Sequence, residues 1–157
     1  MMNTLDHESL GFLVADVSRL IRAEIDRRIT EAGLGLTPGE GRALGHAARA
    51  GEVRQSALAE RMGVEAMTMS TYVDRLQARG LVERVSDPTD RRAKLVRLTP
   101  AAAETLSRIA DISAGLRGDL MRDLSPDDWT HLLASLKSVR ATLCELRASG
   151  RKDRDAA

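Results

Sequence analysis

A short basic loop near the middle of the chain carries the residues best suited to bind phosphate groups or to enter a DNA groove. Between positions 84 and 97, two acidic side chains (Asp87 and Asp90) face five cationic ones, so five minus two gives a local net charge of +3; the cations are Arg84, Arg91, Arg92, Lys94 and Arg97. A guanidinium on such a loop can enter the narrow, negative minor groove or clamp phosphates. Asp90 would be costly beside DNA unless it were paired, so we expect it to hold an arginine side chain. The alternative is a solvated hairpin with incidental charge.

A second candidate surface is the outer face of a helix predicted from Glu65 to Arg79. Its buried stripe recurs at helical spacing and consists of Met69, Tyr72, Val73 and Leu76. The remaining outer face is small and hydroxylated: Ala66, Met67, Thr68, Ser70, Thr71 and Arg75. Hydroxyl groups can bond phosphates or base edges, methionine can contact a thymine methyl, and arginine can reach a phosphate or guanine. The alternative is an ordinary solvated helix face, which usually carries more glutamate and lysine.

The elements that must position these surfaces form a compact predicted unit. A helix from Ser56 to Met62 and a turn at Gly63-Val64 precede the outer-face helix, and strands at Leu81–Val85 and Lys94–Leu98 form a hairpin around the basic loop. Val53 is predicted to be a short strand. Two helices followed by a charged hairpin predict a winged helix-turn-helix, which places one helix in the DNA major groove. Residues at its edges are candidates for contact with the DNA backbone: Gln55, Ser56 and Arg84.

Two helices are predicted before this unit. From Leu5 to about Ala32, apolar residues spaced by three and four indicate one long amphipathic helix. Its apolar stripe could pack on its own domain or on a partner helix. Thr37-Pro38-Gly39-Glu40 has the form of a capping box, which predicts a helix from Pro38 to about Ala50.

Two more helices are predicted after it. Thr99-Pro100 begins one that runs to about Leu124, and Ser125-Pro126-Asp127-Asp128 begins the last. Along the last helix an apolar seam repeats every four and then three residues, which requires another helix as partner: Leu132, Leu136, Val139, Leu143 and Leu146. The chain is therefore predicted to be mostly α-helical with a small β-hairpin wing.

Bulk properties exclude some classes of protein. The 157 residues have a net charge of +1, so attraction to nucleic acid must come from local charge. No apolar run reaches the roughly 18 residues needed to cross a bilayer, and the first ten residues lack the pattern of a signal peptide. The lone Cys144 cannot form an internal disulfide. We expect a cytoplasmic protein that does not bind membranes.

The wing carries a resemblance to a known family. Asp90 to Thr99, DRRAKLVRLT, is similar to the wing signature D-x-R-x-x-x-V-x-L-T of the MarR family of winged helix-turn-helix transcriptional regulators. Leu58-Ala59-Glu60, Val73-Asp74-Arg75-Leu76 and Gly80-Leu81-Val82 match further elements of that family. Ala102 departs from it, because the family usually has glycine there. By resemblance, Arg92 meets the minor groove and Asp90 organises it.

The predicted organisation is a DNA-binding domain between two dimerisation segments. It has an N-terminal helix at 1–35, the winged helix-turn-helix at 36–99, C-terminal helices at 100–150 and a charged tail at 151–157. Pairing of the end helices across a two-fold axis would bury their apolar stripes and space two recognition helices for a pseudo-palindromic operator in double-stranded DNA. The resemblance implies the same homodimer. It also implies a pocket, with Phe12 and Trp129 as lining, for a small phenolic or other aromatic effector that would release a repressor. The alternative is that these isolated aromatic residues belong to the core.

The sequence lacks the patterns expected of an enzyme or a metal-binding protein. Three scattered histidines show no metal-ligand spacing, and the chain has no nucleophile elbow or glycine-rich phosphate loop, so no enzyme, metal or cofactor is expected. Cys144 could sense oxidants, but packing beside Leu143 is the simpler expectation. A winged-helix module that binds only proteins, or an architectural protein that binds DNA without sequence preference, is the alternative class.

Overall fold

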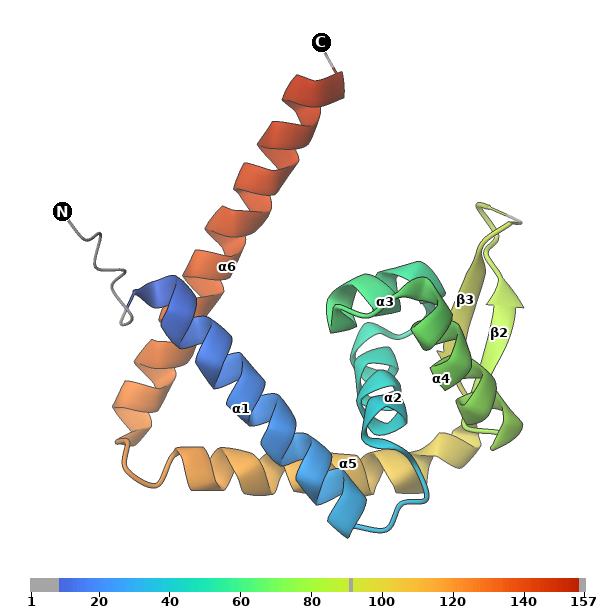
Figure 1. Ribbon diagram of the computed structural model, residues 1–157, viewed down its shortest axis with the longest axis horizontal. Helices are drawn as coiled ribbons and strands as arrows, with labels where there is room; N and C mark the ends of the chain where they lie inside the picture. The colour runs from blue at the N-terminus through green and yellow to red at the C-terminus, as the bar shows by residue number, and fades with distance from the viewer. Residues whose placement is uncertain (1–8, 91, 156–157) are drawn as a thin grey trace, which may run out of the picture. The chain divides into compact units, whose positions relative to one another are not determined.

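The computed structural model describes the backbone at residues 9–90 and 92–155 and the side chains at 9–90 and 92–149. Helices dominate this part of the chain, and one small antiparallel sheet accompanies them (Figure 1). The predicted fold class is confirmed. The elements are α1 (Leu10–Glu31), α2 (Pro38–Ala50), β1 (Val53–Arg54), α3 (Gln55–Met62), α4 (Ala66–Ala78), β2 (Val82–Ser86), β3 (Lys94–Leu98), the 3-10 turn η1 (Pro100–Ala102), α5 (Ala103–Leu120) and α6 (Pro126–Asp155).

Contacts divide the chain into two compact units, Met1–Leu116 and Arg117–Ala157. The first unit contains the winged helix-turn-helix. Its helices α2, α3 and α4 pack on one another, and the hairpin of β2 and β3 lies beside α4 (Figure 1). The second unit is formed by the end of α5 and by α6.

The core of the first unit joins the helices to the sheet. Its largest fully buried side chains come from five helices and strands besides α1: Leu44, Leu58, Met69, Val73, Leu76, Val82 and Val96. Ile29 of α1 is also fully buried, and Leu106, Ile109 and Ile112 of α5 pack against the same core. The expected buried stripe of α4 is confirmed at Met69, Val73 and Leu76, whereas Tyr72 is half-buried.

The start of α2 has the geometry predicted from its sequence. The backbone N–H of Glu40 donates to Thr37 Oγ1 over 3.3 Å, and the backbone N–H of Thr37 donates to Glu40 Oε2 over 3.0 Å. Each bond satisfies an amide that a helix start would otherwise leave unpaired. Gly51, with φ of 73°, ends the helix.

Two helix boundaries differ from the expectation. Thr99 does not cap the following helix with its side chain, because its hydroxyl donates to the carbonyl oxygen of Gly80. The chain then makes a 3-10 turn before α5 begins at Ala103, and α5 ends at Leu120 and not near Leu124. At the last helix, the prediction is confirmed: the N–H of Asp128 donates to Ser125 Oγ over 3.1 Å.

The sheet has three strands, with β3 between β1 and β2. Val96 of β3 lies opposite Val53 of β1 and Arg84 of β2, and its side chain is buried. The residues on either side of it, Leu95 and Arg97, are more exposed, as a strand with one covered face requires. Pairing with β1 fixes the base of the hairpin to the segment that leads into α3.

Asp87 anchors the base of the wing. Its side chain is 5% exposed. Oδ1 accepts hydrogen bonds from the N–H of Thr89 over 2.8 Å and from the Thr89 hydroxyl over 2.7 Å, while Oδ2 accepts one from Arg54 Nε over 2.7 Å. The Thr89 hydrogen bonds and then the Arg54 guanidinium lower the pKa of Asp87 to about 2. The carboxylate thus joins the loop after β2 to β1.

Asp90 organises the turn at the tip of the wing. Its described side-chain bond is made with backbone, because Oδ1 accepts the N–H of Arg92 over 3.0 Å. The Asp90 carbonyl accepts the N–H of Ala93 over 2.9 Å, which closes the turn. At the base of the wing, Asp87 is the carboxylate that holds Arg54. Arg91 lies outside the described residues.

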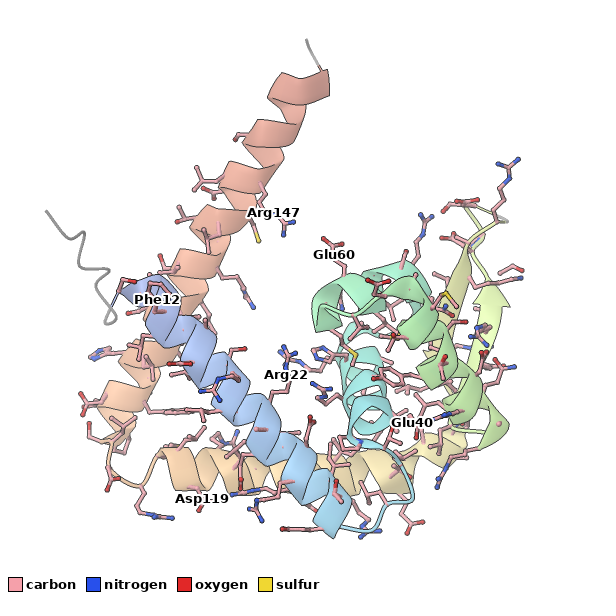
Figure 2. All side chains as sticks on the ribbon, viewed as in Figure 1. Phe12, Arg22, Glu40, Glu60, Asp119 and Arg147 are labelled. Carbon is pink, nitrogen blue, oxygen red and sulfur yellow. The ribbon has the colours of Figure 1, made fainter. Side chains whose placement is uncertain are left out.

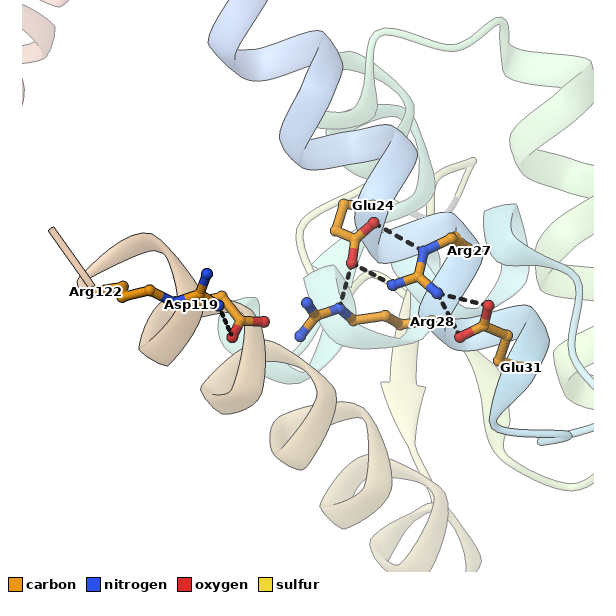
Figure 3. Close-up of polar contacts among 6 residues, drawn as sticks. All are labelled: Glu24, Arg27, Arg28, Glu31, Asp119 and Arg122. Carbon is orange, nitrogen blue, oxygen red and sulfur yellow. Dashed lines mark hydrogen bonds and ion pairs between the residues drawn. The ribbon is translucent and has the colours of Figure 1, made fainter.

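Along α1 an ion-pair series covers the helix surface (Figure 3). Glu24 pairs with Arg27 over 2.6 Å and with Arg28 over 2.7 Å, and Arg27 also pairs with Glu31 over 2.6 Å. Hydrogen bonds from Arg27 and then Arg28 lower the pKa of Glu24 to about 2. Surface pairs of this kind stabilise a helix only modestly.

Long apolar side chains remain exposed in each unit. On α1, the exposed residues include Leu10, Leu13, Val14, Val17 and Leu20. On α6, the predicted seam is exposed by 38% to 64%, at Leu132, Leu136, Val139, Leu143 and Leu146. Cys144 is also exposed.

Asp87→Asn should change how stability depends on pH. The pKa of Asp87 is about 2 in the folded chain and 3.8 for the free side chain, so its carboxylate stabilises the fold fully above pH 3.8. This stabilisation is lost as pH falls through 2. Between pH 5 and pH 3, the urea midpoint measured by circular dichroism should therefore fall less in Asp87→Asn than in the parent protein. Because the pKa of Glu24 is also about 2, the urea midpoint should still fall to some extent in both Asp87→Asn and the parent protein. Asp123→Asn is the control, and equal slopes for Asp87→Asn and the parent would contradict the anchoring role.

Candidate nucleic-acid interface

The face of α4 that points away from the core begins at Met67. Its side chain is 84% exposed. Thr71 and Asp74 follow at spacings of four and three residues, and both are exposed. The Thr71 hydroxyl donates to the carbonyl oxygen of Met67 over 3.1 Å, which leaves its oxygen lone pairs for a donor from outside. This face can therefore offer a thioether, a methyl group and hydroxyl oxygen to a base edge.

The other residues expected on this face lie toward its two edges. Ala66 and Arg75 are exposed, whereas Thr68 and Ser70 are half-buried. Asp74 was missed by the sequence analysis, although its spacing from Met67 and Thr71 is that of one helix face. An acid on a surface that faces DNA requires a nearby cation to offset its charge.

Arg84 supplies that cation. Its Nη1 lies 2.6 Å from Asp74 Oδ1, and its Nε donates to Gln55 Oε1 over 3.0 Å. Further bonds reach Gln77 Oε1 over 3.2 Å and the carbonyl oxygen of Ser70 over 3.3 Å. The side chain is only 21% exposed. Arg84 was predicted to contact the DNA backbone, but its described bonds join β2 to α3 and α4.

The positively charged side chains of the wing are of two kinds, one paired with acidic residues and one exposed to solvent. Arg97 pairs with Glu52 over 3.2 Å and with Glu83 over 2.9 Å, so its charge is compensated on the sheet. Lys94 Nζ donates to Ser86 Oγ over 3.2 Å, and both Lys94 and Arg92 are exposed. Arg92 and Lys94 therefore carry the positive charge that the described part of the wing presents to solvent.

A cleft of about 420 Å³ lies between the wing and the two helices of the DNA-binding motif. Six of the residues predicted at DNA-binding positions line it, together with Arg54, Asp74 and Ala93: Gln55, Ser56, Ser70, Arg84, Arg92 and Lys94. The fold thus gathers residues that are up to 39 positions apart in the sequence, from Gln55 to Lys94. All of its lining residues except Ala93 have polar or charged side chains, which can bind a phosphodiester chain.

Arg75, which was predicted to contact DNA, is paired within the chain. Its Nη1 lies 3.2 Å from Oε1 of Glu40, a residue of α2 that is 4% exposed. Figure 2 labels Glu40 on the first turn of α2. No periodicity within α4 could have predicted this contact, because the two residues are 35 positions apart.

A second cavity, of about 500 Å³, lies among α1, α2 and α5. Its walls are largely apolar, with Ile25, Ile29, Leu106 and Ile109, and three basic side chains also line it: Arg42, His46 and Arg49. Arg42 Nε lies 3.1 Å from Asp26 Oδ1, without the alignment of a hydrogen bond. Neither Phe12 nor Trp129, the expected pocket residues, is among its lining residues.

Positive charge surrounds His46 in this cavity. Burial first, and then the nearby guanidinium groups of Arg49 and Arg42, lower the pKa of its imidazole below the ordinary value. Arg61 and Arg22 act in the same direction. Near neutral pH the imidazole is therefore uncharged, and it can either donate or accept a hydrogen bond.

Two other kinds of site are absent from the described residues. No group of three or more histidine, cysteine, aspartate or glutamate residues gathers there in a way that could hold a metal ion. Nor is any helix in this part of the chain long and apolar enough to cross a membrane.

Known proteins resemble the chain over most of its length. The sequence model of the MarR family matches residues 34–93. The crystal structure of the transcriptional regulator PA3341 shares 34% identity, covers 87% of this chain and 99% of its own, and superposes with a TM-score of 0.74. A MarR family regulator from Silicibacter pomeroyi shares 26% identity over 84% of this chain and 88% of its own, with a TM-score of 0.72.

Wild-type MarR from E. coli in its apo form is also similar. It shares 25% identity over 83% of this chain and 96% of its own, with a TM-score of 0.69. The family match covers the helices and the wing loop that form the cleft, and the structural similarity extends to the flanking helices. This chain belongs to the MarR family of winged helix-turn-helix transcriptional regulators.

Proposed function

We propose that this protein is a cytoplasmic, homodimeric repressor that binds a pseudo-palindromic operator and is released by a small molecule. The family is one of DNA-binding transcriptional regulators. The observation that supports the proposal best is the polar cleft between α4 and the wing, where six of the predicted contact residues meet. In this proposal residues 36–99 bind DNA, whereas 1–35 and 100–150 form the dimer.

In the proposed complex α4 lies in the major groove. Met67 and Thr71 point directly away from the core and meet base edges, with Ala66, Thr68 and Ser70 beside them. Thioether and methyl groups suit the thymine methyl, while hydroxyl groups suit either base edges or phosphates. Gln55 and Ser56 are placed at the flanking backbone.

The wing follows the minor groove. Arg92 is exposed at the turn that Asp90 closes, and Lys94 is exposed at the first position of β3. The closed turn fixes the backbone from which the Arg92 side chain extends, so the backbone loses little conformational freedom when the side chain enters a narrow groove. Arg91, outside the described residues, is proposed as an additional contact.

The exposed apolar faces of α1 and α6 support the dimer. Each is a row of leucine and valine on a long helix, and such a row is stable in water only when it is covered. A second copy is the occupant that supplies two matching rows at once. Two DNA-binding domains in one particle would also explain how a chain of net charge +1 binds DNA tightly.

Leu136→Lys should disrupt that dimer. A charged side chain in the middle of the α6 seam would have to be buried without a partner, so sedimentation velocity at micromolar concentration should show monomers. Ser138→Lys adds the same charge outside the seam and should remain dimeric. A parent protein that sediments as a monomer at this concentration would remove the dimer from the proposal.

Arg92→Ala should weaken operator binding without changing dimerisation. The loss should be about 1 to 3 kcal/mol, measured by fluorescence anisotropy, and the slope of log K against log salt should fall by about 2, because the dimer loses one guanidinium from each subunit. Arg122→Ala is the control, because it removes one exposed charge from outside the DNA-binding domain. Equal affinity of Arg92→Ala and the parent would refute the wing assignment.

The same salt series separates the alternative classes. A winged-helix module that binds only proteins would show no such salt dependence with DNA. An architectural protein would bind unrelated DNA as tightly as the operator, whereas a specific regulator discriminates by a factor of about 1,000 or more.

The cavity among α1, α2 and α5 is proposed as the effector site. Isoleucine and leucine walls suit a flat aromatic body, and Arg42 and Arg49 suit a negative group on it. A phenolic or other aromatic acid therefore fits its chemistry better than a cation. The ligand would act by favouring a form of the protein that binds DNA less well.

A shift assay on the DNA upstream of the protein's own gene would test this site. Hydroxybenzoate at millimolar concentration should release the DNA, while uncharged phenol should be less effective because it lacks the carboxylate. Ala110→Phe, which places a ring in the cavity, should bind DNA but resist release. Ala114→Phe, on the same helix outside the cavity lining, should respond as the parent does. Release of Ala110→Phe at the parental concentration would contradict the assignment.

A further inference from the structure

The recognition helix is held against α2 by a side-chain stripe along one edge of α4. Tyr72, Arg75 and Arg79 follow one another at spacings of three and four residues, so they lie along one side of the helix. Arg79 donates to the carbonyl oxygens of Gly35 and Leu34, the latter over 3.2 Å. All three side chains contact the first turn of α2 or the loop that precedes it.

Tyr72 packs on backbone at this place. A Cβ atom added at Gly39 would lie 2.4 Å from Tyr72 Cζ, so only glycine permits the present approach. On the next residue, Glu40, both carboxylate oxygens are engaged. Oε2 accepts the N–H of Thr37, and Oε1 pairs with Arg75 Nη1 over 3.2 Å.

The burial of Glu40 decides what Arg75 can do. If the guanidinium moved to a DNA phosphate, a carboxylate that is 4% exposed would lose the one cation that the described contacts give it. A buried charge without a counterion is strongly unfavourable, whereas a phosphate contact at the protein surface replaces only counterions and water. The pair with Glu40 is therefore the more stable arrangement of Arg75, both in the free protein and on DNA.

We infer that Glu40 and Arg75 form a positioning pair that sets how α4 is presented to DNA, and that Arg75 does not neutralise a phosphate. This inference rests on the proposed DNA-binding function. It replaces the expectation, drawn from the outer face of α4 alone, that Arg75 contacts the nucleic acid.

Glu40→Gln gives the sharpest test, because the two possible roles of Arg75 predict opposite changes in operator affinity. Glutamine can keep the capping bond to Thr37 but not the ionic attraction to Arg75. If the pair positions α4, Glu40→Gln should weaken operator binding by roughly 2- to 30-fold. If Arg75 is a phosphate contact that Glu40 restrains, the variant frees a cation and removes an anion, so it should bind more tightly.

Arg75→Gln supplies the second readout. It should weaken binding to a similar extent at every salt concentration, with the parental slope of log K against log salt, and the double variant should be no weaker than either single variant. Arg92→Ala, measured alongside, should lower the slope by about 2, one for each subunit of the dimer. Thermal unfolding of each variant, followed by circular dichroism, checks that it is folded at the assay temperature.

The outcomes separate the two proposals. Tighter binding by Glu40→Gln, or a reduced salt slope for Arg75→Gln, would overturn the positioning role and leave the DNA-binding function intact. A parent protein that does not bind its upstream DNA or discriminate it from unrelated sequence would overturn the function on which the positioning role rests. The positioning role would be supported if both single variants bind more weakly with the parental salt slope and the double variant shows no further loss.

Discussion

The placement of the recognition helix depends on how closely α4 and α1 approach the first turn of α2. Glycine at positions 39 and 41 allows this approach, because a Cβ atom would lie 2.4 Å from Tyr72 of α4 in one case and 3.0 Å from Ile29 of α1 in the other. Glu40, between them, bonds Thr37 and pairs with Arg75. The first turn of α2 therefore fixes α4 on one side. On the other side it contacts a wall of the cavity among α1, α2 and α5.

Charge on the DNA-binding domain is controlled by pairing more than by number. Arg54, Arg75, Arg84 and Arg97 are each matched with an acidic side chain over 2.6 to 3.2 Å. Pairs of this kind connect elements, and they cancel much of the field that the sequence composition suggests. The exposed cations Arg92 and Lys94 then act from a wing whose base is fixed by Asp87.

Local patterns predicted most of the fold. The capping box at Thr37, the turn at Gly63 and the strand from Lys94 to Leu98 depend on residues close in sequence, and the structure has all three. The partners of Arg54 and Arg75 lie 33 and 35 positions away, so no periodicity could identify them. Asp74 was different, because helical spacing alone places it beside Met67 and Thr71.

The cavity among α1, α2 and α5 could not be predicted from local sequence patterns either. Its lining comes from three helices that meet only in the folded chain, and it includes Ile29, which is the fully buried residue in the described part of α1. The single aromatic residues Phe12 and Trp129 were conspicuous in the sequence because aromatic residues make up only 2% of the chain. Rarity of a residue type carries no information about where the helices leave space between them.

The carboxylate of Asp74 has a consequence for how the protein searches DNA. It is exposed on the face of α4 that points away from the core, with Arg84 as its counterion. On arbitrary sequence, an acid close to the phosphates is repelled and contributes no compensating bond, which shortens the time spent at each wrong site. At a site that offers a cytosine amino group, the same oxygen accepts a hydrogen bond. In the proposed complex Asp74 thereby lowers the affinity for unrelated DNA while retaining affinity for selected sequences, so fewer copies of the protein would be bound away from the operator.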